Sequence, residues 1–155
     1  MKKTLVMLIL LLIGPVLAAQ QIVMKDLNPL IGEWQGRLTY LDYSSQQEVA
    51  IPVNLLVERK NNKMLIFKYI YPKEPKANSK TTIKVGGNTL NGRNIVGKSY
   101  NNNYLMVVTE GSGRDDGKMA RFTFTYQISA SFFSMRKDVE IDGEQFMRNR
   151  YDFSR

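Results

Sequence analysis

Hydrophobic and polar residues alternate with a period of two along most of the chain after residue 32. The clearest case is the segment 121–128, where the apolar residues Phe122, Phe124, Tyr126 and Ile128 alternate with the polar residues Arg121, Thr123, Thr125 and Gln127. A period of two places successive side chains on opposite faces of a strand. The pattern therefore predicts strands with one dry face and one wet face.

Nine segments carry this pattern or a strand-like apolar run, and turn residues separate them at intervals of roughly 8–12 residues. We expect strands at 33–41, 47–60, 63–71, 80–85, 89–100, 104–110, 118–130, 131–141 and 144–153. The segment 89–100 is long enough for two strands. The prediction is an all-β fold of 8–10 strands, preceded by a short helical turn within residues 20–31 that has Pro29 near its start.

The connections between these strands are too short for crossover helices, so neighbouring strands must pair antiparallel. Asn61-Asn62 and Asp142-Gly143 are predicted two-residue hairpin turns, and 111–117 is predicted to be a longer hairpin loop. An up-and-down meander avoids exposed edges by closing on itself, which predicts a β-barrel. Pro52, inside the second strand, indicates a bulge or an edge position.

The predicted turns set which side chains share a face. With Asn61-Asn62 as a two-residue turn, Phe67, Tyr69 and Tyr71 lie on the face opposite Val57, so this hairpin is apolar on both sides. Either another element covers that outer face or the face is a contact surface.

With Asp142-Gly143 as the turn of the last hairpin, Lys137 lies opposite Arg148 and Met135 lies opposite Arg150. These cations form either an anion site inside the barrel or a wet rim. The acidic residues around this turn resemble a calcium loop only superficially, because Asn149 stands where a bidentate carboxylate is needed.

Residues 1–19 predict a cleavable secretory signal. Lys2 and Lys3 precede the apolar run 5–13, and Ala18 and Ala19 follow a Gly-Pro break. We therefore expect one exported domain, 20–155, in the periplasm or the medium. The apolar run is shorter than a membrane span, so we expect no stable membrane insertion after cleavage.

Composition narrows the chemistry. The chain has no cysteine and no histidine. This disfavours zinc, copper and haem sites and excludes Ser-His-Asp and Cys-His catalysis. The sequence therefore indicates no cofactor, no metal site and no catalytic residue, although a cofactor-free enzyme built on Asp, Glu, Tyr or Lys stays open. The net charge is +8 without a dense basic stretch, and together with export this argues against nucleic acid as a partner.

The motif Gly32-Glu33-Trp34 opens the first strand, and Arg148 or Arg150 lies on the last strand. This arrangement resembles the Gly-x-Trp plus terminal Arg of the calycin superfamily, which includes lipocalins and fatty-acid-binding proteins. The resemblance implies a barrel whose base is plugged by Trp34, with a guanidinium from the closing strand stacked over the indole. The helical lid of fatty-acid-binding proteins and the proximal histidine of nitrobindin-like barrels have no counterpart here.

The favoured interpretation is a non-catalytic binding protein for a small apolar or amphipathic, possibly anionic, molecule. The candidate ligand contacts are Trp34, Tyr40, Arg148 and Arg150. The alternative is an envelope interaction or inhibitor module with a solid barrel. Its anchor residues would be Phe67, Tyr69 and Tyr71.

Overall fold

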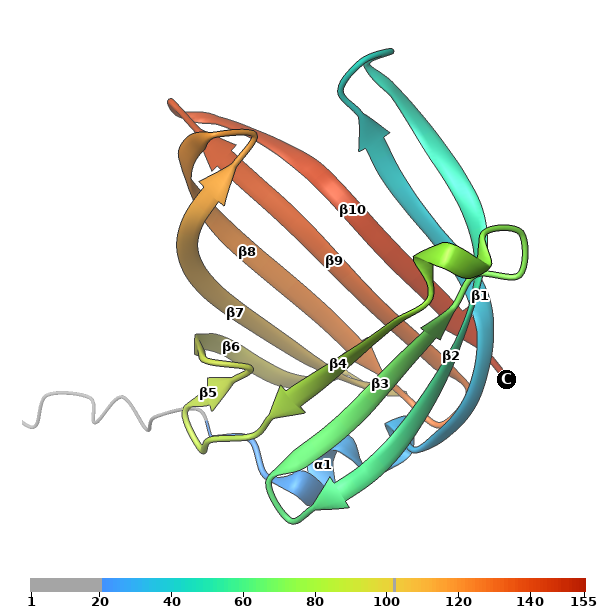
Figure 1. The fold of residues 1–155 in the computed structure, drawn as a ribbon. Helices are drawn as coiled ribbons and strands as arrows, with labels where there is room; N and C mark the ends of the chain where they lie inside the picture. Colours follow the sequence, from blue (N-terminus) through green and yellow to red (C-terminus); the bar gives the residue numbers. More distant parts are fainter. Residues whose placement is uncertain (1–20, 102) are drawn as a thin grey trace, which may run out of the picture.

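The computed structural model describes residues 21–101 and 103–155, so the predicted signal lies outside the described residues. Ten antiparallel strands form one sheet in the order β4-β3-β2-β1-β10-β9-β8-β7-β6-β5. The sheet curls into a nearly closed up-and-down barrel (Figure 1). The predicted all-β barrel is confirmed.

The element bounds match the predicted segments closely. A short helix and a 3₁₀ turn come first, α1 (Met24–Leu27) and η1 (Asn28–Leu30), and a second 3₁₀ turn, η2 (Pro75–Ala77), precedes β4. The strands are β1 (Gly32–Asp42), β2 (Gln47–Asn61), β3 (Met64–Ile70), β4 (Ser79–Lys84), β5 (Thr89–Leu90), β6 (Arg93–Asn101), β7 (Tyr104–Asp115), β8 (Lys118–Ile128), β9 (Phe132–Ile141) and β10 (Glu144–Ser154). The segment 89–100 does form two strands. No helix in the described part of the chain is long and apolar enough to span a membrane.

The barrel is closed through the first and last strands. β1 pairs with β10 from Gln35↔Ser154 to Tyr40↔Asn149. The weak joint lies elsewhere, between β4 and β5, where a single bridge joins Val85 to Leu90. We call this joint the seam.

The first half of β2 is also an edge. The β3 ladder starts only at Asn54, so Pro52 pairs with β1 alone. This confirms the edge position that the proline indicated.

The tight turns use residues that tolerate positive φ. Asp142 and Gly143 have φ of 54° and 85°, as the predicted hairpin requires. The predicted 111–117 loop is wrong, because β7 runs to Asp115 and only Asp116-Gly117 form the turn. The glycines in this stretch make room inside the barrel: a Cβ at Gly113 would lie 2.9 Å from Cε2 of Phe122.

A register shift corrects the predicted pairing of β2 with β3. The turn falls at 62–63, one residue later than predicted, and a bulge lies between Arg59 and Asn61. Val57 therefore pairs with Phe67, so Phe67, Tyr69 and Tyr71 point inward and are buried. The expectation that these three aromatic residues form an outer contact surface is wrong.

A second bulge corrects the last hairpin. The ladder between β9 and β10 shifts between Met147 and Asn149, so Lys137 pairs with Asn149 and not with Arg148. Arg150 then lies opposite Arg136 on the outer face, and the expected pairing of Arg150 with Met135 is wrong. One extra residue on one strand inverts the faces of all the residues beyond it.

The barrel is packed solid at the end that α1 covers, which we call the base (Figure 1). Trp34 is 1% exposed and donates a hydrogen bond from Nε1 to the Leu30 carbonyl oxygen at 2.7 Å. The Phe133 ring lies 6.3 Å from the indole between centroids and stacks on Phe153 at 5.8 Å. Trp34 is thus the base plug that the resemblance implies.

Arg155 is the arginine that stacks over Trp34. Its Cζ lies 4.1 Å from the indole centroid, and its three guanidinium nitrogens donate to the carbonyl oxygens of Pro29, Ile31 and Ala130 at 2.7–2.9 Å. The expected role of Arg148 or Arg150 here is wrong. Gly32 belongs to the same arrangement, because its φ is 122° and a Cβ there would lie 2.8 Å from Arg155 Nη1.

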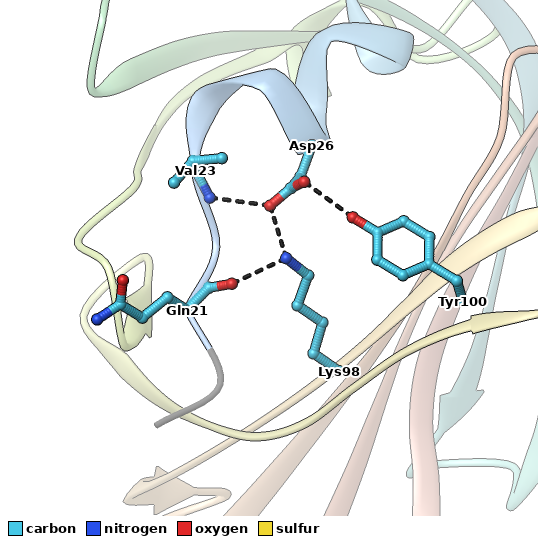
Figure 2. Close-up of polar contacts among 5 residues, drawn as sticks. All are labelled: Gln21, Val23, Asp26, Lys98 and Tyr100. Atoms are coloured by element: carbon cyan, nitrogen blue, oxygen red, sulfur yellow. Dashed lines mark hydrogen bonds and ion pairs between the residues drawn. The ribbon is translucent and has the colours of Figure 1, made fainter. Parts of the chain in front are cut away.

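A polar latch fastens the N-terminal segment to β6 (Figure 2). Asp26 accepts hydrogen bonds from the Val23 N–H at 3.0 Å, from Lys98 Nζ at 2.8 Å and from the Tyr100 hydroxyl at 2.9 Å. Lys98 also donates to the Gln21 carbonyl oxygen at 2.8 Å. Burial alone would raise the pKa of Asp26, but the hydrogen bonds from Lys98, Val23 and Tyr100 hold that pKa below its ordinary value.

We expect Asp26→Asn to lower the free energy of unfolding by about 1–3 kcal/mol, because a largely buried Lys98 ammonium loses its charged partner. The folded pKa of Asp26 lies below the ordinary 3.8, so its contribution is present above pH 3.8 and is lost as pH falls through the folded pKa. Chemical denaturation at several pH values measures this. Asp142→Asn is the control, since that side chain is 83% exposed; equal effects of both variants would contradict the latch.

We expect Arg155→Met to red-shift the emission of Trp34, the single tryptophan, because the indole loses its cover. The free energy of unfolding should fall by about 1–2 kcal/mol. Arg150→Met serves as the matched control and should leave the emission unchanged. If the Trp34 emission shifts in Arg150→Met and not in Arg155→Met, Arg150 and not Arg155 is the arginine that stacks on the indole.

Candidate ligand-binding site in the barrel interior

The inner wall changes from buried to half-buried along each strand. On β1, Trp34 is buried, whereas Leu38 and Tyr40 on the same face are half-buried. On β10, Phe153 is buried and Tyr151 is half-buried. Solvent therefore reaches the inner wall away from the base. We call this region the upper wall; its apolar members are Leu38, Tyr40, Ile51, Phe124, Met135 and Tyr151.

Tyrosines border the upper wall. The hydroxyl oxygens of Tyr71 and Tyr151 lie 3.1 Å apart, and the rings of Tyr69 and Tyr151 lie 5.1 Å apart. Burial raises the pKa of Tyr69 and, together with the Tyr71 hydrogen bond, that of Tyr151. These phenols are therefore neutral hydrogen-bonding groups next to an apolar surface.

Arg93 brings a positive charge to this wall. Its side chain passes over Gly111, where a Cβ would lie 3.1 Å from Arg93 Cγ. The guanidinium carbon lies 3.8 Å from the Phe124 ring centroid, and Nη2 donates to the Tyr126 hydroxyl at 2.8 Å. Burial raises the pKa of Tyr126, so the partner is a neutral phenol.

Arg93 has no charged partner. Its Nε is buried without a hydrogen-bond partner, and no described carboxylate forms an ion pair with it. Arg93 is half-buried, and its buried Nε is desolvated without a carboxylate to compensate that cost. The arrangement favours a negatively charged group from outside the chain.

A second polar group lies farther from the base and consists of Tyr43, Asp115, Lys137 and Arg148, which we call the rim cluster. Asp115 accepts a hydrogen bond from Tyr43, and its carboxylate lies 3.3 Å from Lys137 Nζ and 3.7 Å from Arg148 Nε. Arg148 also donates to the Leu41 carbonyl oxygen at 2.7 Å. Two cations, Lys137 and Arg148, thus share the carboxylate of Asp115.

The rim cluster shifts the pKa values of its acids in opposite directions. Burial would raise the pKa of Asp115, but Tyr43, Lys137 and Arg148 hold it below its ordinary value. Burial, with the hydrogen bond to Asp115, raises the pKa of Tyr43 to about 12. Asp115 is therefore ionised and Tyr43 neutral over the whole physiological pH range.

The structure separates the four residues that the sequence suggested as ligand contacts. Tyr40 lies on the upper wall and Arg148 lies in the rim cluster. Trp34 is buried in the base, away from solvent. Arg150 lies on the outer face and pairs with Asp152 at 2.7 Å, so the expectation that it faces the interior is wrong.

Sequence reasoning missed Arg93 and Arg155. For Arg155 a signal existed: it continues the alternation of Tyr151 and Phe153, which places it on the inner face. For Arg93 the only hint was Gly111, a small residue in a strand that leaves space for a large neighbour. Among residues 21–101 and 103–155, no cluster of acidic side chains is arranged to hold a metal ion.

Comparison with known proteins supports the architecture alone. No protein-family model and no curated protein matches the chain. The crystal structure of Rv2717c from M. tuberculosis is similar with a TM-score of 0.58 and 11% identity, over 85% of this chain and 96% of that chain. A DUF3598-family protein of unknown function from Nostoc punctiforme has a TM-score of 0.42 and 12% identity, over 83% of this chain and 48% of that chain. At such identities the likeness to Rv2717c concerns the fold and not the function.

We expect Asp115→Asn to lower the pKa of Tyr43 from about 12 toward its ordinary 10.0, because the carboxylate that repels the phenolate is lost. Burial persists in the variant, so part of the shift should remain. Nuclear magnetic resonance of ring-labelled tyrosine during an alkaline titration measures this. Glu58→Gln, at the other end of the barrel, is the control; an unchanged Tyr43 titration in Asp115→Asn would contradict the contact.

Proposed function

We propose that the chain is an exported, calycin-like binding protein that holds a small amphipathic molecule with an anionic head group. The apolar part of the molecule lies along the upper wall, and the head group pairs with Arg93. The proposal includes no catalytic step. Export rests on the signal pattern of residues 1–19.

The observation that carries the proposal is the unpaired Arg93. Surface arginines meet water and need no partner, but this guanidinium is packed on Phe124 and has a buried, unsatisfied Nε. An oxyanion that approached it would gain a charge-assisted hydrogen bond in a region of low dielectric constant, where such bonds are strongest.

The charge on the inner wall agrees with an anionic ligand. Lys137 and Arg148 share Asp115, and Arg93 adds a third cation. Of these three cations, Arg93 is the one without a carboxylate among the described residues, so it is the group expected to attract an anion. The adjacent apolar residues Leu38, Ile51 and Met135 then select anions that carry a hydrocarbon portion, since these side chains are half-buried and gain from further burial.

The size of the barrel suits a single small ligand. Its base is filled by a continuous core that includes Trp34, Phe67 and Phe133. The upper wall is the half-buried part of the inner face, so we expect a short hydrocarbon chain or a compact ring system there and not a long lipid.

We expect wild-type protein to bind a fluorescent fatty-acid analogue more tightly than the matching fatty alcohol. Arg93→Met should weaken binding of the acid roughly ten- to hundredfold and leave the alcohol unchanged, because a charged hydrogen bond of about 1.5–3 kcal/mol is lost. Fluorescence titration gives both Kd values.

The matched control is Arg121→Met, which removes an outer-face arginine whose side chain is 65% exposed. It should bind both probes like wild type. Native mass spectrometry of protein recovered from its own host supplies a second readout, since a bound anion appears as a discrete added mass. Equal affinity of wild type and Arg93→Met for the acid would falsify the proposal.

A further inference from the structure

The outer face of the barrel carries a polar hollow far from the inner wall. It has a volume of about 210 Å³ and spans β8, β9 and β10. We call it the outer pocket; its lining residues are Thr125, Gln127, Ser134, Arg136, Arg150 and Asp152. All six side chains leave the sheet on the side opposite Tyr126, Phe133 and Phe153.

Two arginines lie directly opposite each other across the outer pocket. Arg136 of β9 pairs with Arg150 of β10 in the ladder. Like charges in such a position destabilise a bare sheet. Here each arginine is held by an aspartate two residues later on its own strand: Arg136 contacts Asp138 at 2.7 Å and Arg150 contacts Asp152 at 2.7 Å. The ion pairs neutralise the charges and fix both guanidinium groups.

This arrangement leaves guanidinium N–H donors and carboxylate lone pairs free to bind a further group. Arg136 donates to Asp138 through Nε and Nη2, and Arg150 donates to Asp152 through Nε alone. The remaining Nη groups have no hydrogen-bond partner among the described residues. Asp152 accepts one bond at each oxygen, from Ser134 and from Arg150, and each carboxylate oxygen can accept another.

The charge balance decides which ligand fits. An oxyanion would meet the guanidinium groups but would also be repelled by Asp152, which lines the same pocket. A cation would face the reverse conflict with Arg136 and Arg150. Hydroxyl groups avoid both conflicts, because each one donates to a carboxylate and accepts from a guanidinium.

An aromatic ring continues the polar surface. Phe132 precedes Ser134 by two residues on the same face of β9 and is 37% exposed. It lines an adjoining hollow of about 320 Å³ that shares Asp152 with the outer pocket. A pyranose ring has an apolar C–H face and an edge of hydroxyl groups, so it can contact Phe132 and the Asp152–Arg150 pair together.

We propose that the outer pocket and Phe132 bind one unit of a neutral saccharide. Three neighbouring strands of a continuous ladder hold the contacting groups, so they are preorganised and little freedom is lost on binding. The site is shallow and accommodates a single sugar unit. We therefore expect a weak, monovalent affinity.

The test is a nuclear magnetic resonance titration of the whole domain, residues 20–155, with maltotriose, cellotriose and chitotriose. At least one trisaccharide should shift the backbone amides around Phe132, Ser134 and Asp152 and leave those of Tyr40 and Ile51 unchanged, which are upper-wall positions outside the three strands of the pocket. Phe132→Ala should weaken that binding about fivefold. Met119→Ala, which truncates a side chain that is 65% exposed elsewhere, is the matched control and should bind like wild type.

Two further arms make the outcome decisive. Asp152→Asn tests the hydroxyl acceptor and should weaken saccharide binding, with thermal unfolding checked to confirm that the variant is folded. Inorganic phosphate is the competing probe: shifts at Arg136 and Arg150 with phosphate, and none with the three sugars, would make the pocket an anion site and overturn the proposal. The absence of any shift would overturn it as well. Arg93→Met should bind the saccharide normally, which keeps this test independent of the interior site.

Discussion

The pairing of β1 with β10 is the constraint on which the rest of the structure depends. It brings the end of the chain beside its first strand and places Arg155 over Trp34 at the base. The three carbonyl oxygens that Arg155 binds belong to two separate connections, one before β1 and one before β9. A single side chain therefore joins both connections to the closing strands. Because the base is filled in this way, only the opposite half of the interior stays accessible to solvent.

The alternation of residue types predicted most of the fold. Strand positions, the inward face of β8 and the turn at Asp142-Gly143 could all be read from the sequence, because each depends on neighbouring residues only. The two bulges could not be read, since an extra residue in a ladder depends on the partner strand. Each bulge inverted the faces beyond it, which placed Phe67, Tyr69 and Tyr71 inside the barrel and Arg150 outside it.

The same limit explains why the candidate site was only partly predicted. Tyr40 and Arg148, which the sequence suggested as candidates, do lie at the interior or its rim, because both are near the ends of strands whose positions were predicted correctly. Arg93 was not found, because its environment is made by Gly111, Phe124 and Tyr126 from two other strands. Pairing partners across a sheet, and not composition, determine whether an arginine is a solvated surface group or an unpaired interior cation.

The seam between β4 and β5 determines where the barrel wall opens most easily. Every other joint in the wall is a ladder. Here Gly86 and Thr89 exchange backbone hydrogen bonds at 3.0 and 3.3 Å in the turn between the two strands, and beyond that turn one bridge, Val85↔Leu90, and a hydrogen bond from Asn91 N–H to the Lys84 carbonyl oxygen at 2.7 Å connect the two edges. A curved sheet under outward strain parts first where the fewest bonds resist. Local opening of the barrel wall is therefore expected to begin between β4 and β5, while the remaining strands keep their register.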